Sequence, residues 1–360
     1  MESSPAARVS ETIKTLLLLY SALAKRHQEK RPEISSVTLE AIRRLHWIDV
    51  RIRATKYVAG FVGLGNVGKS TLLNALFGVA VAPRKNRPMT SACVEYHYGE
   101  TFSLKIEFEG TFERSVTQCA DAKELLDAIE SYATEEGSNA TDQISAVRAY
   151  LPADILSKGL IVADTPGFGA AQLNGGEGTH EATLVKYLPK IHQVFWVILC
   201  EQGITAKEAA FYTSRLRRNC DDIVVTGSED ITEPDERRFK KRFNQPLGLN
   251  FMDYHFLSGK RGWLAREAQD QEALQQSGII AFEKRLKDMA SEDDRVNHFI
   301  EDLVYLSQDF GVWLRGQLND GPIEWPNAAW HRAIYAADSI PLTIGKRQTT
   351  LGEALKQALS

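Results

Sequence analysis

Residues 60–78, GFVGLGNVGKSTLLNALFG, decide the fold. They contain the pattern G-x-x-x-x-G-K-[ST], with an apolar run from Tyr57 before it and the apolar spacing of a helix after it. In such a loop, glycines let backbone N–H groups converge on phosphate oxygens at a helix N-terminus, whose dipole favours anions. The pattern therefore predicts a phosphate-binding loop. The residues expected to contact the nucleotide here are Gly63, Asn66, Val67, Gly68, Lys69, Ser70 and Thr71.

Apolar strands alternate with helical patterns on the C-terminal side of this loop. Such alternation is typical of an α/β fold with a doubly wound, mostly parallel sheet, as in P-loop NTPases. Two neighbouring segments, 92–99 and 102–110, alternate in polarity and predict an antiparallel pair. The other expected strands are 57–62, 144–151, one ending at Asp164, 193–200, 222–227 and 254–260. Thr205 and Glu208 predict a capping box for one of the helices between them.

Helical patterns flank the predicted sheet on both sides and favour a flanking α-helical bundle. Residues 8–29 and 36–55 predict two helices, the second capped by Ser35 or Ser36, and a long helix from Ser291 ends before Asp320-Gly321-Pro322. The expected domains are an N-terminal helical neck (1–55), a GTPase-type domain (56–265), helices packing with 1–55 (266–320), and a tail (321–360). The tail offers a surface for a partner.

Composition limits the cellular setting. The net charge of −4 argues against nucleic acid as a partner, because proteins that bind it normally carry a basic excess. Four cysteines without metal-type spacing indicate free thiols and a cytoplasmic location. No run approaches the ~18 apolar residues of a membrane span, so membrane contact is expected to be peripheral.

Two further segments supply the expected magnesium ligands and hydrolytic groups. Asp164-Thr165-Pro166-Gly167 follows a buried strand, where Asp164 can hold Mg²⁺ through water and the Gly167 N–H can meet the γ-phosphate. Thr90 lies in the loop after the first helix, where its hydroxyl can complete the Mg²⁺ shell and its carbonyl can orient the attacking water. Together with Ser70, these residues form the predicted metal site, and Lys69 is expected to bridge the β- and γ-phosphates.

The base-reading segments depart from the usual pattern. The Asn/Thr-Lys-x-Asp motif selects guanine through its carboxylate, and Thr226 fits its first position, but Gly227 replaces the lysine. Either Glu229, one methylene longer, or Asp230, one residue late, must supply the carboxylate. Ser258-Gly259-Lys260 lies where a backbone amide can reach the guanine oxygen.

These motifs, in this order, resemble those of the dynamin superfamily of GTPases, especially bacterial dynamin-like proteins. The segments RPMTSACVEYHYG (87–99) and AYLPADILSKGLIVADTPGFG (149–169) carry the resemblance, together with the 74 residues between Thr90 and Asp164. It covers roughly residues 56–265. The resemblance implies GTP hydrolysis with Mg²⁺, and dimerisation through the nucleotide face with itself or a larger relative. The glutamine that orients water in Ras-type proteins is replaced by Phe168.

The loop residue Asn66 has two interpretations of about equal weight. The resemblance implies K⁺ as a second cation, held by the Asn66 carbonyl oxygen against the phosphates. Alternatively, Asn66 only tolerates a strained loop conformation.

Function also has alternatives. The first is a minimal GTPase whose nucleotide state moves the helical neck; the second is a degenerate nucleotide-binding scaffold with little hydrolysis, indicated by the altered base motif. A GTPase directed to ribosomes or tRNA is disfavoured by the acidic net charge.

Overall fold

The computed structural model forms two compact units. One comprises residues 56–287 and contains the sheet; the other comprises residues 1–55 and 288–360 and is mainly helical. The residues that the structure describes are 4–53, 56–83, 93–108, 114–133, 144–167, 179–216, 222–247, 253–318, 325, 327–338, 340–344 and 347–359.

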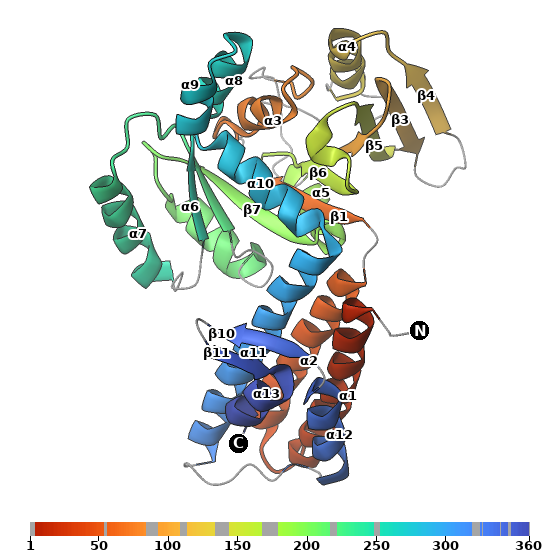
Figure 1. Ribbon diagram of the computed structural model, residues 1–360, viewed down its shortest axis with the longest axis vertical. Helices are drawn as coiled ribbons and strands as arrows, with labels where there is room; N and C mark the ends of the chain where they lie inside the picture. The colour runs from red at the N-terminus through yellow and green to blue at the C-terminus, as the bar shows by residue number, and fades with distance from the viewer. Residues whose placement is uncertain are drawn as a thin grey trace. The chain divides into compact units, whose positions relative to one another are not determined.

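Among the described residues of the first unit, nine strands form one sheet in the order β4-β3-β5-β2-β6-β1-β7-β8-β9 (Figure 1). The strands are β1 (Tyr57–Val62), β2 (Val94–Tyr98), β3 (Ser103–Phe108), β4 (Arg114–Gln118), β5 (Ile144–Leu151), β6 (Leu160–Asp164), β7 (Gln193–Leu199), β8 (Asp222–Thr226) and β9 (Asp253–Leu257). The five strands from β6 to β9 in this order are parallel. The predicted α/β fold with a mostly parallel sheet is confirmed.

Strand β1 lies at the centre of this parallel part. It pairs with β6 on one side and β7 on the other, and every residue of YVAGFV is buried. Burial on both faces explains why the segment is apolar throughout instead of alternating. Phe61 is in register with Asp164, so the phosphate loop and the turn after Asp164 leave the sheet at the same edge.

Helices cover both faces of the sheet. On one face, side chains from α5, α6 and α7 pack with alternate residues of β1, β6, β7 and β8, around Trp196. On the other face α10 crosses the sheet (Figure 1), where Phe282 makes edge-on ring contacts with Phe61 and Phe195. The helices of this unit are α3 (Lys69–Phe77), α4 (Ala122–Ala133), α5 (Thr179–Tyr187), α6 (Ala206–Phe211), α7 (Glu233–Leu247), α8 (Gly259–Glu267), α9 (Gln271–Gln276) and α10 (Ile279–Ala290).

Three short helical turns are also described in this unit. They are the 3₁₀ turns Asp154–Leu156 and Leu188–Lys190 and the π-helical turn Tyr212–Leu216 after α6. The capping box predicted between Thr205 and Glu208 is present at the start of α6.

The predicted antiparallel pair of 92–99 and 102–110 is wrong. Both segments are strands, but β5 lies between them, parallel to β2 and antiparallel to β3. The short connection at 99–102 suggested a hairpin, whereas β5 supplies the buried Val147, Ala149 and Leu151 for an interior position. Non-local burial therefore prevails over sequence proximity. The edge strand β4 was not predicted.

The helical unit is built from the flanking segments. Its elements are α1 (Pro5–His27), α2 (Pro32–Ile52), α11 (Glu292–Gln317), α12 (Asn327–Asp338), the hairpin β10 (Pro341–Ile344) and β11 (Arg347–Thr350), and α13 (Leu351–Leu359). Helix α2 begins at Pro32, before the expected cap at Ser35 or Ser36, because proline at the first position suits a helix start. Ser35 is instead buried within the helix.

The two predicted boundaries around the helical unit differ from the structure. Residues 266–287 belong to the sheet unit, since α10 contributes Phe282 to its core. The tail belongs to the helical unit, where the Trp325 indole donates to the Leu359 carbonyl at 2.9 Å and stacks on Trp330. Within the described ranges, none of the helices combines the length and apolar character needed to cross a membrane.

A buried carboxylate fixes the sheet edge opposite the phosphate loop. Asp222, fully buried at the start of β8, accepts hydrogen bonds from Gln193 at 2.6 Å and Arg285 at 2.8 Å, and lies 2.6 Å from His255 Nε2. Burial alone raises the pKa of Asp222, but the bond to His255 and the charge of Arg285 outweigh it, and the net pKa is lowered. Stability from this group is therefore present above the ordinary aspartate pKa and is lost as pH falls through the lowered one.

We expect Asp222→Asn to lower the free energy of unfolding of the sheet unit by about 3 kcal/mol, because it removes a fully buried negative charge that His255 and Arg285 both contact and places an amide N–H group among donors. Urea titration followed by hydrogen exchange of β7–β9 measures the change. The matched control is Asp253→Asn, which removes an exposed carboxylate 3.0 Å from the same guanidinium. That control should cost less than about 1 kcal/mol; equal losses would contradict the assignment.

Candidate functional site

The phosphate loop connects β1 to α3 at the centre of the sheet edge. Lys69, the first residue of α3, is buried, and its Nζ donates to the Gly63 carbonyl at 3.1 Å and the Leu64 carbonyl at 2.8 Å. These bonds hold the ammonium group across the mouth of the loop. Ser70 and Thr71 follow in the first turn of α3 and are partly exposed. The structure thus brings the predicted loop residues into one cradle.

Two positions of this loop require glycine, one because of close approach and the other because of its backbone conformation. A Cβ on Gly63 would lie 2.3 Å from the Val197 carbonyl oxygen of β7, far inside contact distance. Gly68 has φ +85°, a left-handed conformation that glycine adopts without strain. The side chain of Val67, between them, is buried and anchors the loop to the core.

Asn66 is exposed and has φ +63°. Asparagine tolerates the left-handed region better than most residues, so the strain interpretation has a structural basis. Exposure also leaves the side-chain amide accessible for a cation. Both interpretations stand.

The turn after β6 packs directly on the phosphate loop. A Cβ on Gly167 would lie 2.8 Å from the Gly65 nitrogen, so only glycine fits this contact. The Thr165 hydroxyl donates to the Phe61 carbonyl at 2.7 Å and ties the turn to β1. Asp164 is buried and in register with Phe61. The structure therefore places Asp164 and Gly167 beside Lys69, as the sequence predicts.

Three buried charges face one another here. Burial lowers the pKa of Lys69, and the nearby carboxylates of Asp164 and Glu208 oppose this shift. Burial likewise raises the pKa of Asp164 to about 6, and Lys69 opposes the change. Glu208 was predicted only as a helix cap; its carboxylate caps α6 through Thr205, but it also contributes negative charge near Lys69. No sequence motif indicated this second contact.

Thr226, at the end of β8, links the base-reading strand to the phosphate loop. Its Oγ1 lies 2.5 Å from the Val67 carbonyl oxygen and 3.1 Å from that of Ile198, so the single hydroxyl proton is shared between two buried carbonyls. The threonine therefore fixes the loop from behind instead of contacting the base directly.

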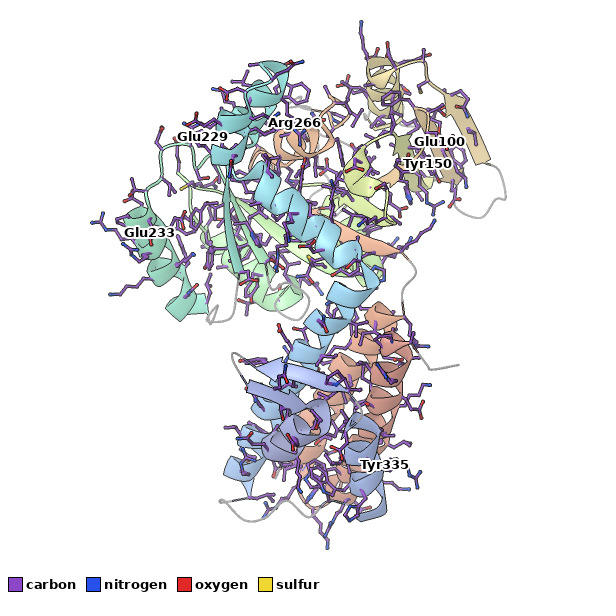
Figure 2. All side chains as sticks on the ribbon, in the orientation of Figure 1. Glu100, Tyr150, Glu229, Glu233, Arg266 and Tyr335 are labelled. Atoms are coloured by element: carbon purple, nitrogen blue, oxygen red, sulfur yellow. The ribbon has the colours of Figure 1, made fainter. Side chains whose placement is uncertain are left out.

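Glu229, and not Asp230, contacts the second base-reading segment, Ser258-Gly259-Lys260. The Ser258 hydroxyl donates to Glu229 Oε1 at 2.6 Å, next to the start of α8 (Figure 2), whereas Asp230 is exposed. The remaining carboxylate lone pairs of Glu229 stay available for a base edge. Gly227 has φ +67°, and a Cβ there would lie 2.9 Å from Leu199 Cδ1. A lysine at this position would be strained, which accounts for the altered motif.

Ser258 and Gly259 begin α8 against the phosphate-loop helix. The Ser258 hydroxyl accepts from the Arg261 N–H at 2.9 Å and caps α8, so the expected strand ends at Leu257. A Cβ on Gly259 would lie 3.0 Å from the Leu72 backbone of α3. Lys260 is exposed. Both base-reading segments thus meet at the carboxyl ends of β8 and β9.

Thr90 and Phe168 lie outside the described residues, so their predicted roles remain predictions. Residues 81–83, which come just before the undescribed segment that carries Thr90, are described. Asn74 of α3 accepts from the N–H groups of Val81 and Ala82 at 2.8 and 2.7 Å, and donates to the Ala82 carbonyl at 2.8 Å. One buried side chain therefore anchors the start of the segment that carries Thr90.

The residues present fit a magnesium ion. The hydroxyl of Ser70 and the carboxylate of Asp164 are oxygen donors of the kind Mg²⁺ prefers, beside a backbone cradle that a Cβ on Gly63 or Gly167 would fill. Among the described residues, no group of three or more His, Cys, Asp or Glu side chains could hold a metal. Mg²⁺ usually takes one or two protein ligands and completes its shell with water and phosphate.

Comparison with known proteins places this geometry in context. The model of the Dynamin family matches residues 60–226. The chain is 24% identical over 296 residues to a Caldicellulosiruptor sp. (strain Rt8B.4) protein described as "Uncharacterized protein in xynA 3'region", covering 79% of this chain and 69% of that one. It is 25% identical over 240 residues to the "Bacterial dynamin-like protein" of Nostoc punctiforme, covering 63% of this chain and 33% of the relative. The chain therefore spans about a third of the Nostoc protein.

A solved structure shares the fold. It is described by the words "An oligomerised bacterial dynamin pair provides a mechanism for the long range sensing and tethering of membranes", and it matches with a TM-score of 0.50 at 17% identity. The match covers 86% of this chain and 48% of the other. At this identity the likeness concerns the fold alone.

We expect Thr226→Val to weaken nucleotide binding about tenfold, because it removes the hydroxyl that holds the Val67 carbonyl while keeping the side-chain volume. Thr226→Ser keeps the hydroxyl and should bind within about twofold of the native chain. Titration with a fluorescent guanine nucleotide measures both. Equal affinity of the two variants would show that the phosphate loop does not depend on this bond.

Proposed function

We propose that this chain, whose residues 60–226 form a GTPase domain of the dynamin superfamily, hydrolyses GTP to GDP and phosphate and couples its nucleotide state to movement of its helical unit. The observation that carries the proposal is the hydrogen bond from Ser258 to Glu229, which joins both base-reading segments beside an intact phosphate loop. A carboxylate held there accepts from the N–H groups on the guanine edge. Adenine has no N–H donors at those positions, so it would leave the Glu229 oxygen that does not bind Ser258 without a partner on the base.

The residues of the chain divide the work of hydrolysis. Backbone N–H groups from Gly63 to Ser70 hold the β-phosphate, and Lys69 moves from the loop carbonyls to the phosphate oxygens. The Gly167 N–H meets the γ-phosphate, and the Thr90 carbonyl orients the attacking water. Ser70, Thr90 and, through water, Asp164 would hold Mg²⁺, which would supply positive charge to the phosphate oxygens.

The chain would act with a partner. We assign dimerisation to the nucleotide face, either with a second copy or with a larger dynamin-like relative, since catalytic groups otherwise supplied by a glutamine must come from elsewhere. The oligomerised bacterial dynamin pair that shares the fold supports this assignment. Its description also mentions tethering of membranes, and for this chain we extend that only to peripheral membrane contact.

Calorimetry with GTP, GDP and ATP in K⁺ and Mg²⁺ tests base selection. We expect guanine nucleotides to be preferred over ATP by at least about 100-fold, because adenine offers no N–H donor to the Glu229 oxygen that does not bind Ser258. Glu229→Gln should lose most of this preference, and Asp230→Asn should keep it. Lys69→Ala is the control for the phosphate loop and should abolish turnover.

Two results would point away from this proposal. If the Glu229→Gln variant prefers guanine nucleotides over ATP as strongly as the native chain does, another group reads the base. Tight guanine binding with negligible turnover, even at high protein concentration, would instead favour the scaffold alternative.

The cation role of Asn66 is tested with Asn66→Gly, which preserves the φ of +63° without strain but removes the side chain. If the amide holds K⁺, turnover of the native chain should be several-fold faster in K⁺ than in Na⁺, and the variant should lose that difference. If Asn66 only tolerates the backbone conformation, the variant should match the native chain in both salts.

A further inference from the structure

A buried carboxylate in β2 gathers hydrogen bonds from three other side chains. Glu95 is 8% exposed; it accepts from Arg148 Nε at 2.9 Å and from the Tyr187 hydroxyl at 2.7 Å, and its Oε2 lies 3.0 Å from His97 Nε2. Burial alone raises the pKa of Glu95, but the bonds from His97, Tyr187 and Arg148 lower it to about 2. The group is therefore an anion that its neighbours fully compensate.

The partners of Glu95 lie on elements that flank the nucleotide site. Strand β2 begins at Val94, four residues after Thr90, and Val94 is in register with Asp164 of β6. Tyr187 is the last residue of α5, the first helix after the Asp164–Gly167 turn. Its bond to Glu95 thus joins the strand that follows one catalytic segment to the helix that follows the other.

The sheet side of this link is rigid. Arg148 of β5 pairs with Glu95 and also with Glu107 of β3 at 2.6 Å, while the His97 ring stacks on Tyr150. Glu95 cannot follow α5 if that helix shifts, because two other strands hold it in place. Movement of α5 must therefore break the Tyr187 bond or be prevented by it.

On the helix side, α5 is linked to Glu95 by a single polar group, the Tyr187 hydroxyl, whose surroundings are otherwise apolar. Tyr187 packs in the same cluster as Cys93, Ala163 and Leu184, and its hydroxyl donates to a charged acceptor. Burial raises the pKa of Tyr187 well above its ordinary value, so the hydroxyl remains a donor. A bond to an ionised acceptor is about twice as strong as a neutral one.

We propose that Tyr187 and Glu95 are positioning residues for hydrolysis, whose hydrogen bond fixes α5 against β2, the strand that pairs with β6 at Asp164. This inference rests on the proposed GTPase function. Neither residue touches the nucleotide; they act by fixing the elements that carry residues that do.

The test compares Tyr187→Phe with Tyr254→Phe. Each removes one hydroxyl that donates at 2.7 Å, in one case to Glu95 and in the other to Asn244 near the outer edge strand β9. We expect Tyr187→Phe to lower kcat for GTP about tenfold while KM stays within about twofold, a loss typical of one hydrogen bond to a charged group. Tyr254→Phe should leave both constants within about twofold. Similar kcat values, or a loss explained by a lower Tm of Tyr187→Phe, would overturn the inference.

A second measurement separates this inference from the proposed function. Hydrogen exchange with and without a nonhydrolysable GTP analogue reports on β2 and α5 without turnover. The native chain should gain protection in both segments, and Tyr187→Phe should gain it in β2 alone. If the native chain does not hydrolyse GTP, the proposed function fails. The exchange comparison of the native chain with Tyr187→Phe still shows whether the Tyr187–Glu95 bond couples α5 to β2. Equal protection of α5 in both proteins, or no response to the nucleotide in the native chain, would overturn it.

Discussion

The parallel pairing of β1 between β6 and β7 is the constraint on which the rest of the site depends. Because Phe61 is in register with Asp164, the chain leaves both strands at the same height, and the Thr165 hydroxyl can reach back to the Phe61 carbonyl. The same edge receives β8, whose Thr226 holds the phosphate loop from behind. A slip of one residue in this register would invert every side chain on β1 and separate Lys69 from Asp164.

Local patterns predicted much of the sheet unit, because buried parallel strands are apolar throughout and the helices between them have clear caps such as Thr205 with Glu208. Pairing was harder to predict. The order of β3, β5 and β2 depends on contacts between residues far apart in the sequence, which neighbouring segments do not encode. The hairpin and helix α12 of the tail were missed because α12 is short and gains its stability from packing against α1.

The candidate site was predictable where a backbone constraint leaves a sequence pattern. Gly63 and Gly167 belong to known motifs because no Cβ fits at either position. The choice between Glu229 and Asp230 needed coordinates, since it depends on the direction of a side chain after a left-handed Gly227. No motif indicated that Glu208 or Tyr187 would lie near the charges of the site. Their contacts with the charges around the site come from the packing of α6 and α5 on the sheet.

The position of β2 has a consequence for the synthesis of the protein. Its two partners, represented by Val147 and Asp164, follow Val94 in the chain by 53 and 70 residues. At the usual translation rate of about 5 to 20 residues per second, both edges of this strand stay unpaired for roughly 3 to 11 seconds after it leaves the ribosome. A nascent chain thus exposes Val94 and Tyr96 without neighbours for that time, and early folding of the molecule is open to assistance by chaperones.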